Sequence, residues 1–256
     1  MGEVLVLCYH ALSQDFPASL SVSPETLRDQ LGGLVRRGYR GATFSESITG
    51  THAGKTLAVT FDDAYRSVVE LALPVLREYE LPGTVFAPTA YIGSEIPMHW
   101  PGIDRWHGTA HETELIPCSW PELERLIEAG WEVGSHSRTH PRLPELTDDD
   151  LITELRDSRL ECEERLGVAC RSIAYPYGAV NDRVADAVAA AGYSFGAELS
   201  GILRSPAEPL RWPRVGVYHR DHRLRFLLKT AGFPRALRGT KAWSIVDRFR
   251  QARRHA

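Results

Sequence analysis

Two adjacent carboxylates close an apolar segment of the chain. Asp62 and Asp63 directly follow residues 56–61, a run with β-branched members that is typical of a buried strand. Burying one carboxylate is costly, and burying two side by side requires a compensating cation or a raised pKa. The pair is also compatible with a turn, or with the N-terminal cap of a helix that begins at about residue 64.

Two histidines follow a second predicted strand. His136 and His140 lie between Gly134 and Pro141, which favours a loop after the short segment 131–133. Their spacing lets both imidazoles reach one metal ion, and a carboxylate would complete a three-ligand site with an open position for water. The same spacing also occurs by coincidence. Parallel α/β folds gather their chemistry at the carboxyl ends of strands, so we expect the aspartates and histidines to meet.

These two motifs and a Tyr-Pro-Tyr-Gly segment at residues 175–178 occur in the order found in a known family. The chain resembles the polysaccharide deacetylase family, the metal-dependent carbohydrate esterases that share the NodB homology domain. The similarity covers about residues 1–220. Two positions depart from the family pattern. Ala64 stands where the family usually has glycine, and Ala174 stands where many members carry an arginine two residues before the proline.

The resemblance implies roles for individual residues. Asp63, His136 and His140 would bind a divalent metal, most simply Zn²⁺, with Co²⁺, Ni²⁺ or Fe²⁺ as alternatives. Asp62 would be the general base that takes a proton from the attacking water. The backbone N–H of Tyr177 would donate to the developing oxyanion.

The departure at Ala174 leaves Asp62 without the arginine that steadies it in other members. Arg214, in a Trp-Pro-Arg-Val segment on a late predicted strand, is our candidate for a substitute. The alternative is an ordinary surface arginine.

A general acid that protonates the leaving amine is expected from a histidine after an apolar strand. The family implies a late one, which here is His219, but residues 4–9 form a longer apolar run that ends in His10. The first and last strands of a closed barrel are neighbours, so a permuted N-terminal strand could supply this group. We therefore favour His10 over His219. The alternative for His10 is a buried, hydrogen-bonded core residue.

Aromatic residues are the candidates for sugar contacts. Residues 89–117 show no periodicity, and they contain Trp100 and Trp106, whose rings suit the apolar faces of sugars. The alternative is a loop whose tryptophans only cover the fold. Tyr175 is a further candidate for substrate binding, although Tyr175 and Tyr177 are equally compatible with packing roles.

Strands alternate with helices along the whole chain, which favours parallel βαβ units. Six or more such units favour a barrel, and the resemblance sharpens this α/β fold to an irregular (β/α) barrel of about seven parallel strands. The predicted strands cover residues 4–9, 41–44, 57–61, 84–88, 131–133, 172–175, 193–199 and 212–218. The predicted helices cover residues 24–37, 65–79, 120–129, 148–166 and 182–192, followed by helical structure from residue 221.

Composition bounds the remaining possibilities. A chain of 256 residues with 43% hydrophobic residues can bury one full core. We assign residues 1–235 to a catalytic domain and residues 236–256 to a basic helix that packs on the barrel or extends from it, with a membrane surface or a partner as alternative contacts. A net charge of −3 gives no electrostatic reason to bind nucleic acid.

The chain as given begins without a basic region or an apolar run long enough for a signal peptide or a transmembrane segment, so we expect a cytoplasmic protein. The four cysteines show neither a Cys-x-x-Cys spacing nor a secreted pattern, which favours reduced and mostly buried thiols without assigned chemistry. They are Cys8, Cys118, Cys162 and Cys170.

The predicted function is metal-dependent hydrolysis of an acetamido group on an N-acetylated sugar or glycoside. A cytoplasmic location favours a small, lipid-linked or nucleotide-linked substrate over a finished wall polymer. One alternative is an amidohydrolase that cleaves a C–N bond in a non-sugar metabolite. Another is a carbohydrate-binding relative without turnover, against which the intact Asp62, Asp63, His136 and His140 set argues.

Overall fold

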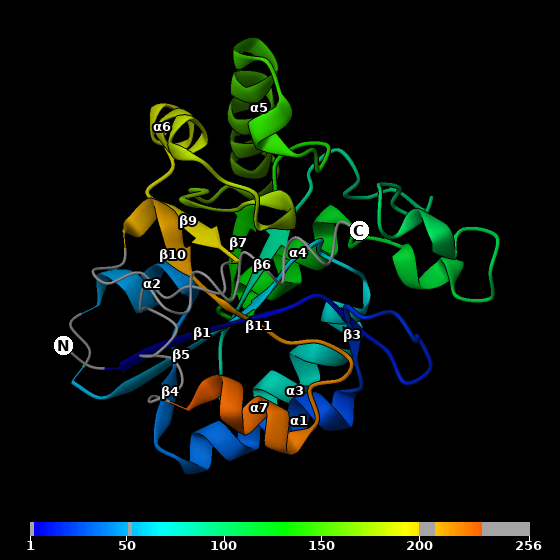
Figure 1. Cartoon of the computed structure of the whole chain (residues 1–256), viewed down its shortest axis with the longest axis vertical. Coiled ribbons are helices and arrows are strands. Elements are labelled where there is room, and N and C mark those ends of the chain that lie inside the picture. Colours follow the sequence, from blue (N-terminus) through cyan, green and yellow to red (C-terminus); the bar gives the residue numbers. More distant parts are fainter. Residues whose placement is uncertain (1–2, 51–52, 200–207, 232–256) are drawn as a thin grey trace, which may run out of the picture.

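The computed structural model describes residues 3–50, 53–199 and 208–231 (Figure 1). The basic helix predicted for residues 236–256 lies outside these described residues. Among the described helices, none combines the length and the apolar character that a membrane crossing requires.

The central feature is a nine-stranded sheet in which every pairing is parallel. The strands follow the order β10-β9-β8-β7-β6-β5-β1-β11, and β4 pairs with the first half of β5. Two further short strands, β2 and β3, pair only with each other. The strands are β1 Glu3–Tyr9, β2 Ala11–Leu12, β3 Ser21–Val22, β4 Tyr39–Gly41, β5 Lys55–Phe61, β6 Gly83–Ala87, β7 Glu132–Ser135, β8 Ser172–Ala174, β9 Phe195–Glu198, β10 Trp212–Pro213 and β11 Val215–Gly216.

The chain itself joins the two ends of this sheet. β10 pairs with β9 at one end, β11 pairs with β1 at the other, and only Arg214 separates the two short strands. The backbone N–H of Arg214 donates to Glu198 O at 2.9 Å. The strand predicted for residues 212–218 is therefore interrupted, and we call the stretch 212–216 the seam. Counting β10 and β11 as one strand leaves eight strands, seven in the main order and β4 beside β5, which agrees with the predicted irregular barrel of about seven strands.

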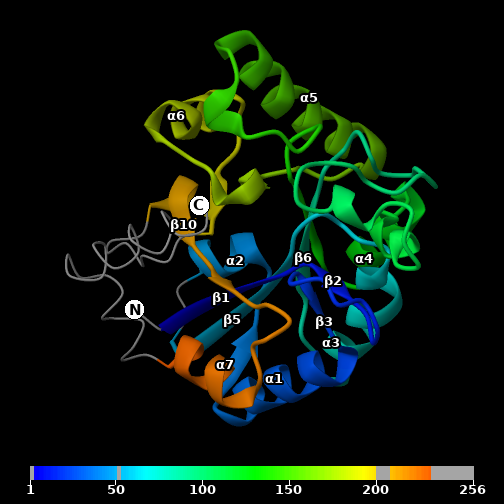
Figure 2. The same cartoon turned by 45° about the vertical axis from the view of Figure 1, so that its right-hand side comes forward.

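Helices cover the outside of the sheet, with α5 and α6 on one side and α1, α3 and α7 on the other (Figures 1 and 2). Four helices begin where polar capping residues predict, because the capping side chain accepts a backbone N–H of the first turn. These caps are Ser23, Ser119, Thr147 and Asn181. The helices are α1 Pro24–Arg36, α2 Phe44–Thr49, a π-helical turn Val68–Ala72 that continues into α3 Leu73–Glu78, α4 Trp120–Glu128, α5 Asp148–Leu166, α6 Asp182–Ala190 and α7 Arg223–Thr230.

The prediction of a strand over residues 41–44 was wrong beyond its first residue. β4 ends at Gly41, and the chain then enters α2. A capping box causes this: the Thr43 side chain accepts the backbone N–H of Glu46, while the Glu46 side chain accepts the backbone N–H of Thr43. Phe44, the first residue of α2, is completely buried against Phe86 in the barrel.

The register of the first strands determines which side chains enter the barrel. β1 pairs with β5 so that Val6 lies beside Ala58 and Cys8 beside Thr60. Because side chains alternate along a strand, Cys8 and Thr60 share the inner face of Val6 and Ala58. Small residues on this face leave room for two phenylalanines and for the Arg214 side chain. The inner cluster consists of Val6, Phe44, Ala58, Phe86, Ala174 and Ala197.

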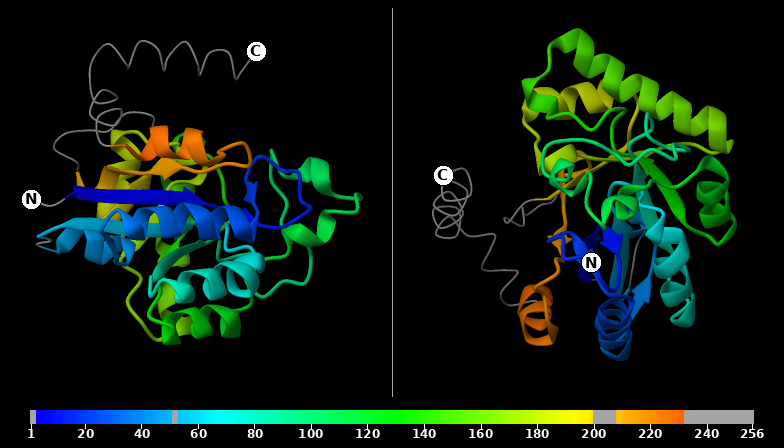
Figure 3. Two further views of the ribbon diagram at one scale, coloured as in Figure 1. Left: turned by 90° about the horizontal axis from the view of Figure 1, so that it is seen from below. Right: turned by 90° about the vertical axis from the view of Figure 1, so that its right-hand side faces the viewer.

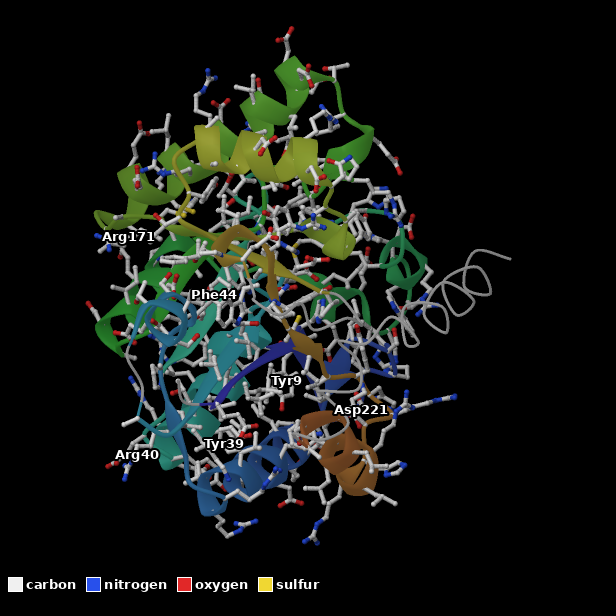
Figure 4. The ribbon with its side chains drawn as sticks, turned by 60° about the vertical axis from the view of Figure 1, so that its left-hand side comes forward. Tyr9, Tyr39, Arg40, Phe44, Arg171 and Asp221 are labelled. Atoms are coloured by element: carbon white, nitrogen blue, oxygen red, sulfur yellow. The ribbon has the colours of Figure 1, made fainter. Side chains whose placement is uncertain are left out.

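Polar contacts fix α1 and α7 beside the seam. The Tyr9 hydroxyl on β1 donates to Gln30 Oε1 at 2.8 Å, and Gln30 Nε2 donates to the Asp221 carbonyl at 2.9 Å. The Asp221 carboxylate, 1% exposed, pairs with Lys229 of α7. Figure 4 labels Tyr9 and Asp221, the two residues that the Gln30 side chain connects.

The long segment 89–117 contains no strand, as predicted, and includes two short 3₁₀ helices, Asp104–Trp106 and Glu112–Leu115. It lies beside the loop that follows β1 (Figure 3). The Phe16 and Trp106 rings meet edge to face at 5.0 Å, and Ser13 Oγ donates to Glu114 Oε1 at 2.6 Å.

Gly196 in β9 provides a test of the barrel packing. A Cβ at this position would lie 2.2 Å from Leu210 O and 2.5 Å from the Tyr175 hydroxyl oxygen, so Gly196→Ala should lower the free energy of unfolding by about 3 kcal/mol. Denaturant titration followed by circular dichroism measures the change. Gly54→Ala is the matched control, because a Cβ there meets nothing within 4 Å. Equal denaturant midpoints of unfolding for Gly196→Ala and Gly54→Ala would contradict this packing.

Candidate metal and hydrolytic site

Three predicted metal ligands meet at the carboxyl ends of β5 and β7. Asp63 Oδ1 lies 3.3 Å from His136 Nε2 and 3.4 Å from His140 Nε2. All three side chains are buried, and Asp63 Oδ1 has no hydrogen-bond partner among the described residues. A buried carboxylate oxygen that faces two imidazole nitrogens is a suitable donor set for a divalent cation, so the residues fit the metal that the sequence predicts.

Hydrogen bonding and burial determine the protonation of the two imidazoles and of Asp63. His136 Nδ1 lies 2.8 Å from the Ala174 carbonyl oxygen, which fixes the proton on Nδ1 and leaves Nε2 as an acceptor. Burial lowers the pKa of His140 to about 3, which keeps its ring neutral. Burial also lowers the pKa of His136, but Asp62 and Asp63 raise it by more. For Asp63, burial raises the pKa, and the nearby histidines, His136, His140 and His10, together lower it by more.

Glu154 of α5 holds the loop between the two histidines. Its Oε2 accepts the backbone N–H groups of Arg138 at 2.8 Å and Thr139 at 2.9 Å, and its Oε1 accepts the Thr139 hydroxyl at 2.6 Å. Sequence analysis missed this residue. The only local signal was a carboxylate on the helix after the loop, and helical periodicity does not show which neighbouring loop it reaches.

Backbone strain concentrates in the three loops that carry the site. Six residues other than glycine have a positive φ in the described ranges, and five of them belong to these loops. Such conformations are costly for residues with a Cβ and persist where the surroundings enforce them, often at functional sites. The φ of 49° at Ala64 also explains why a glycine is common there. The five residues are Asp63, Ala64, Ser137, His140 and Tyr177.

Asp62 is held by Arg214, which reaches it from the seam. Arg214 Nη1 donates to Asp62 Oδ1 at 2.6 Å and Nη2 donates to Oδ2 at 2.8 Å, while Nη1 also lies 2.9 Å from Thr60 Oγ1. Arg214 is 1% exposed, so this is not a surface arginine. Burial raises the pKa of Asp62, but the charge and hydrogen bonds of Arg214, together with the nearby His136 and His10, lower it by more in sum, and the carboxylate stays ionised. Ala174, at the position where many members have the arginine, contributes only its carbonyl, to His136.

The structure places His10 at the site and His219 away from it. His10 Nε2 lies 4.0 Å from Asp62 Oδ2, and the side chain is buried. Burial lowers the pKa of His10, so the resting imidazole is neutral. His219 is exposed in a turn, where its backbone N–H donates to Ser19 O. β1 and β11 pair directly, so the first and last strands are neighbours, as expected.

Of the two tryptophans, only Trp100 contacts the site. Its ring stacks on His140 with the centroids 4.1 Å apart, and with 6% exposure it covers that ligand. Trp106 packs instead on Phe16 and His111. The alternative of a covering loop therefore fits Trp106 better than a sugar contact does.

The two tyrosines differ in position. Tyr175 is completely buried and its hydroxyl donates to Leu210 O at 2.6 Å, so its predicted contact with substrate was wrong: the packing alternative holds. Tyr177 is half-buried, and its ring lies edge-on to His140 at 4.7 Å, under the Arg142 guanidinium.

Removing the Glu154 side chain should weaken metal binding. Glu154→Ala frees two backbone N–H groups of the loop between the ligands, and loss of such supporting contacts typically costs about 10–100-fold in metal affinity. Equilibrium dialysis against Zn²⁺ measures the change. Glu164→Ala is the matched control, since Glu164 is an exposed residue of the same helix. Unchanged affinity in Glu154→Ala would show that the loop holds its shape without Glu154.

A double-mutant cycle tests the Asp62–Arg214 pair. Arg214→Gln leaves a buried carboxylate unpaired and should lower the free energy of unfolding by about 3–5 kcal/mol. Combining it with Asp62→Asn should cost clearly less than the sum of the single changes. The exposed pair Arg28–Glu78 has the same two-bond geometry and should show much weaker coupling. Additive losses at Asp62 and Arg214 would contradict a strong buried pair.

Two staphylococcal proteins with similar sequences are both named as deacetylases. Over 199 residues the chain is 25% identical to the poly-beta-1,6-N-acetyl-D-glucosamine N-deacetylase of Staphylococcus aureus, which covers 73% of this chain and 63% of that protein. The protein of the same name from Staphylococcus epidermidis is 25% identical over 209 residues, 76% of this chain and 67% of that protein. The chain thus spans less than two thirds of the length of the S. aureus relatives.

Solved structures share the fold. A Streptococcus pyogenes deacetylase, PplD, solved in complex with acetate, superposes with a TM-score of 0.73 at 22% identity, covering 90% of this chain and 98% of that one. IcaB from Ammonifex degensii gives a TM-score of 0.70 at 24% identity, covering the same shares of the two chains. The family model described as polysaccharide deacetylase matches residues 49–196, more than half of the sequence. This chain therefore belongs to the polysaccharide deacetylase family.

Proposed function

We propose that this protein is a metal-dependent N-deacetylase that hydrolyses an acetamido group on a sugar. The observation that carries the proposal is the juxtaposition of Asp63, His136 and His140 with a second carboxylate, Asp62, which a buried arginine holds. The names of the staphylococcal relatives support an N-acetylglucosamine-containing substrate.

Asp63, His136 and His140 would hold the metal. Zn²⁺ is our first choice because neutral imidazoles and one carboxylate suit it, and Co²⁺, Ni²⁺ or Fe²⁺ would be accepted by the same set. When bound, a divalent metal polarises a carbonyl and lowers the pKa of a water ligand.

Asp62 would act as the general base. Its neighbour Asp63 faces the histidines, whereas Asp62 faces Arg214, so the two carboxylates have separate tasks. The Arg214 guanidinium reduces the basicity of Asp62, but it fixes the carboxylate in one orientation and keeps it ionised. A correctly placed weak base can accept a proton from a water that is already acidified.

His10 would return the proton to the leaving amine. Its imidazole is neutral at rest, so it must first gain a proton, and Asp62 Oδ2 at 4.0 Å is the nearest acidic oxygen described. The backbone N–H of Tyr177 would stabilise the oxyanion. The positive φ of Tyr177 sets the direction of this peptide group, and Pro176, which lacks an N–H, cannot take its place.

Acetate release from N-acetylated glucosamine monomers and oligomers of graded length tests the function. We expect release that disappears after the metal is stripped and returns with Zn²⁺. A panel of non-sugar amides in the same assay addresses an amidohydrolase, and binding of oligomers without any release would support a non-catalytic relative. Absence of acetate from every sugar with the metal restored would overturn the proposal.

Substitution of the two aspartates should affect turnover and metal binding differently. Asp62→Asn should retain the metal and lose turnover by about two to four powers of ten, because it removes the general base. Asp63→Asn should lose the metal itself. Metal analysis of both purified variants together with acetate assays separates the roles, and equal loss of metal in both would show that the assignment is wrong.

Substitution of the two histidines tests the general acid. His10→Ala should lower turnover strongly while the metal bound at Asp63 stays in place, because His10 is not among the three ligands. His219→Ala should have almost no effect, since His219 is exposed and away from the site. Acetate assays with metal analysis decide between them. A silent His10 variant and an inactive His219 variant would transfer the role to His219.

A further inference from the structure

A second group of potential metal-ligating side chains includes Asp62 and two residues at the end of β1. Cys8 Sγ is 3.3 Å from Asp62 Oδ2, and His10 Nε2 is 4.0 Å from the same oxygen. Ligand atoms of the three residues all lie within 4.8 Å of one another, and all three side chains are buried. The register of β1 and β5 brings the cluster together, because Cys8 lies beside Thr60 near the end of β1, and His10 and Asp62 directly follow the paired residues Tyr9 and Phe61.

The separations match those around a small divalent cation. Bonds of about 2.0–2.1 Å to nitrogen or oxygen and 2.3 Å to sulfur place tetrahedral ligands about 3.3–3.7 Å apart. The two separations from Asp62 Oδ2, 3.3 Å and 4.0 Å, lie within or close to this range, and the cation would draw the Cys8 and His10 ligand atoms, now within 4.8 Å, toward it. A cysteine, a histidine and a carboxylate form a set that favours thiophilic ions over Mg²⁺ or Mn²⁺.

The histidine of this cluster has an unused ligand capacity. His10 is 8% exposed, and its Nδ1 has no hydrogen-bond partner among the described residues. Burial lowers the pKa of His10, which leaves the ring neutral and able to bind a metal. A buried imidazole nitrogen without a hydrogen bond is uncommon, but the ligand atom here would be the other nitrogen, Nε2, which faces Asp62 Oδ2 at 4.0 Å.

We propose that Cys8, His10 and Asp62 form a second cation site, selective for Zn²⁺ or Cd²⁺, whose occupation inhibits the enzyme. The thiol hydrogen that now points at Asp62 Oδ2 would leave as one proton, and the cation would take its place between sulfur and oxygen. Asp62 would lose its capacity as a base and His10 its capacity as an acid. The inhibition rests on the proposed deacetylation, but the binding does not.

This site should bind a cation more weakly than the site formed by Asp63, His136 and His140. Burial raises the pKa of the Cys8 thiol, so the cation must displace a tightly held proton. The Arg214 guanidinium, bonded to the same carboxylate, opposes another positive charge. Arg214 Nη2 and the Cys8 thiol occupy different lone pairs of Oδ2, so replacing the thiol proton leaves the arginine contacts intact. We therefore expect the cation to bind only after the Asp63 site is filled.

Titration of the metal-free protein with Co²⁺ tests the binding without any substrate. The first equivalent should give no thiolate-to-cobalt charge-transfer absorption, and the second should produce it with release of one proton. Cys8→Ser should lose this band and bind one equivalent of Zn²⁺ tightly. Cys118→Ser, which changes another buried thiol, should retain the band and both equivalents.

The proposed second site is wrong if the wild-type protein saturates at one equivalent of Co²⁺. It is also wrong if the charge-transfer band persists in Cys8→Ser. Circular dichroism verifies folding, and His10→Gln replaces Cys8→Ser if the latter does not fold. For inhibition, acetate release at one equivalent is compared with release in excess Zn²⁺. We expect excess Zn²⁺ to inhibit and excess Mn²⁺ to have little effect, with the Cys8→Ser variant requiring at least about tenfold more Zn²⁺.

The two proposals fail separately. Two bound equivalents without acetate release from any sugar would refute the deacetylation and retain the second site. Acetate release with one equivalent bound, and no inhibition by excess Zn²⁺, would refute the second site and retain the deacetylation.

Discussion

The bond between Arg214 and Asp62 is the interaction on which the arrangement of the site depends. Both oxygens of Asp62 accept hydrogen bonds from the guanidinium, at 2.6 and 2.8 Å, and both side chains are buried. A buried ion pair is weak evidence of stability, because desolvation offsets much of the attraction. Its value here is geometric: Asp62 is directed away from the ligand group, and Asp63, the next residue, is left facing the histidines.

The position of Arg214 also explains the shape of the barrel. The residue lies between β10 and β11, where the last strand breaks from β9 and joins β1. Its side chain fills the interior above the Phe86 ring, and small residues on the neighbouring strands make this possible. The residue that connects the two ends of the sheet therefore also positions Asp62.

Local signals predicted much of this fold. The caps at Ser119 and Thr147 start helices where the sequence places them, because an N-cap satisfies backbone groups only three residues away. The ligand motifs were visible because each is contiguous. The strand expected at residues 41–44 failed because the Thr43–Glu46 capping box was overlooked, although it too is local.

Contacts between distant segments could not be predicted in the same way. Glu154 reaches the histidine loop from another element, and nothing in its own helix marks this reach. Tyr175 lies in a motif that indicates a site, but the strand pleat turns its side chain toward Leu210. Arg214 was chosen because a late strand had to replace a missing arginine, and the break in that strand was not visible in the sequence.

The interrupted last strand has a consequence for biosynthesis. Asp62 and Arg214 are 152 positions apart, and Leu7 pairs with Val215 across the seam. During translation the strands from β1 to β9 are made before the residue that orients the base, and non-local contacts of this kind form late. A nascent chain released before Arg214 would hold all three ligands, Asp63, His136 and His140, beside an unrestrained Asp62. The arrangement proposed for hydrolysis should therefore form only after the chain has been made through Arg214 and the barrel has closed.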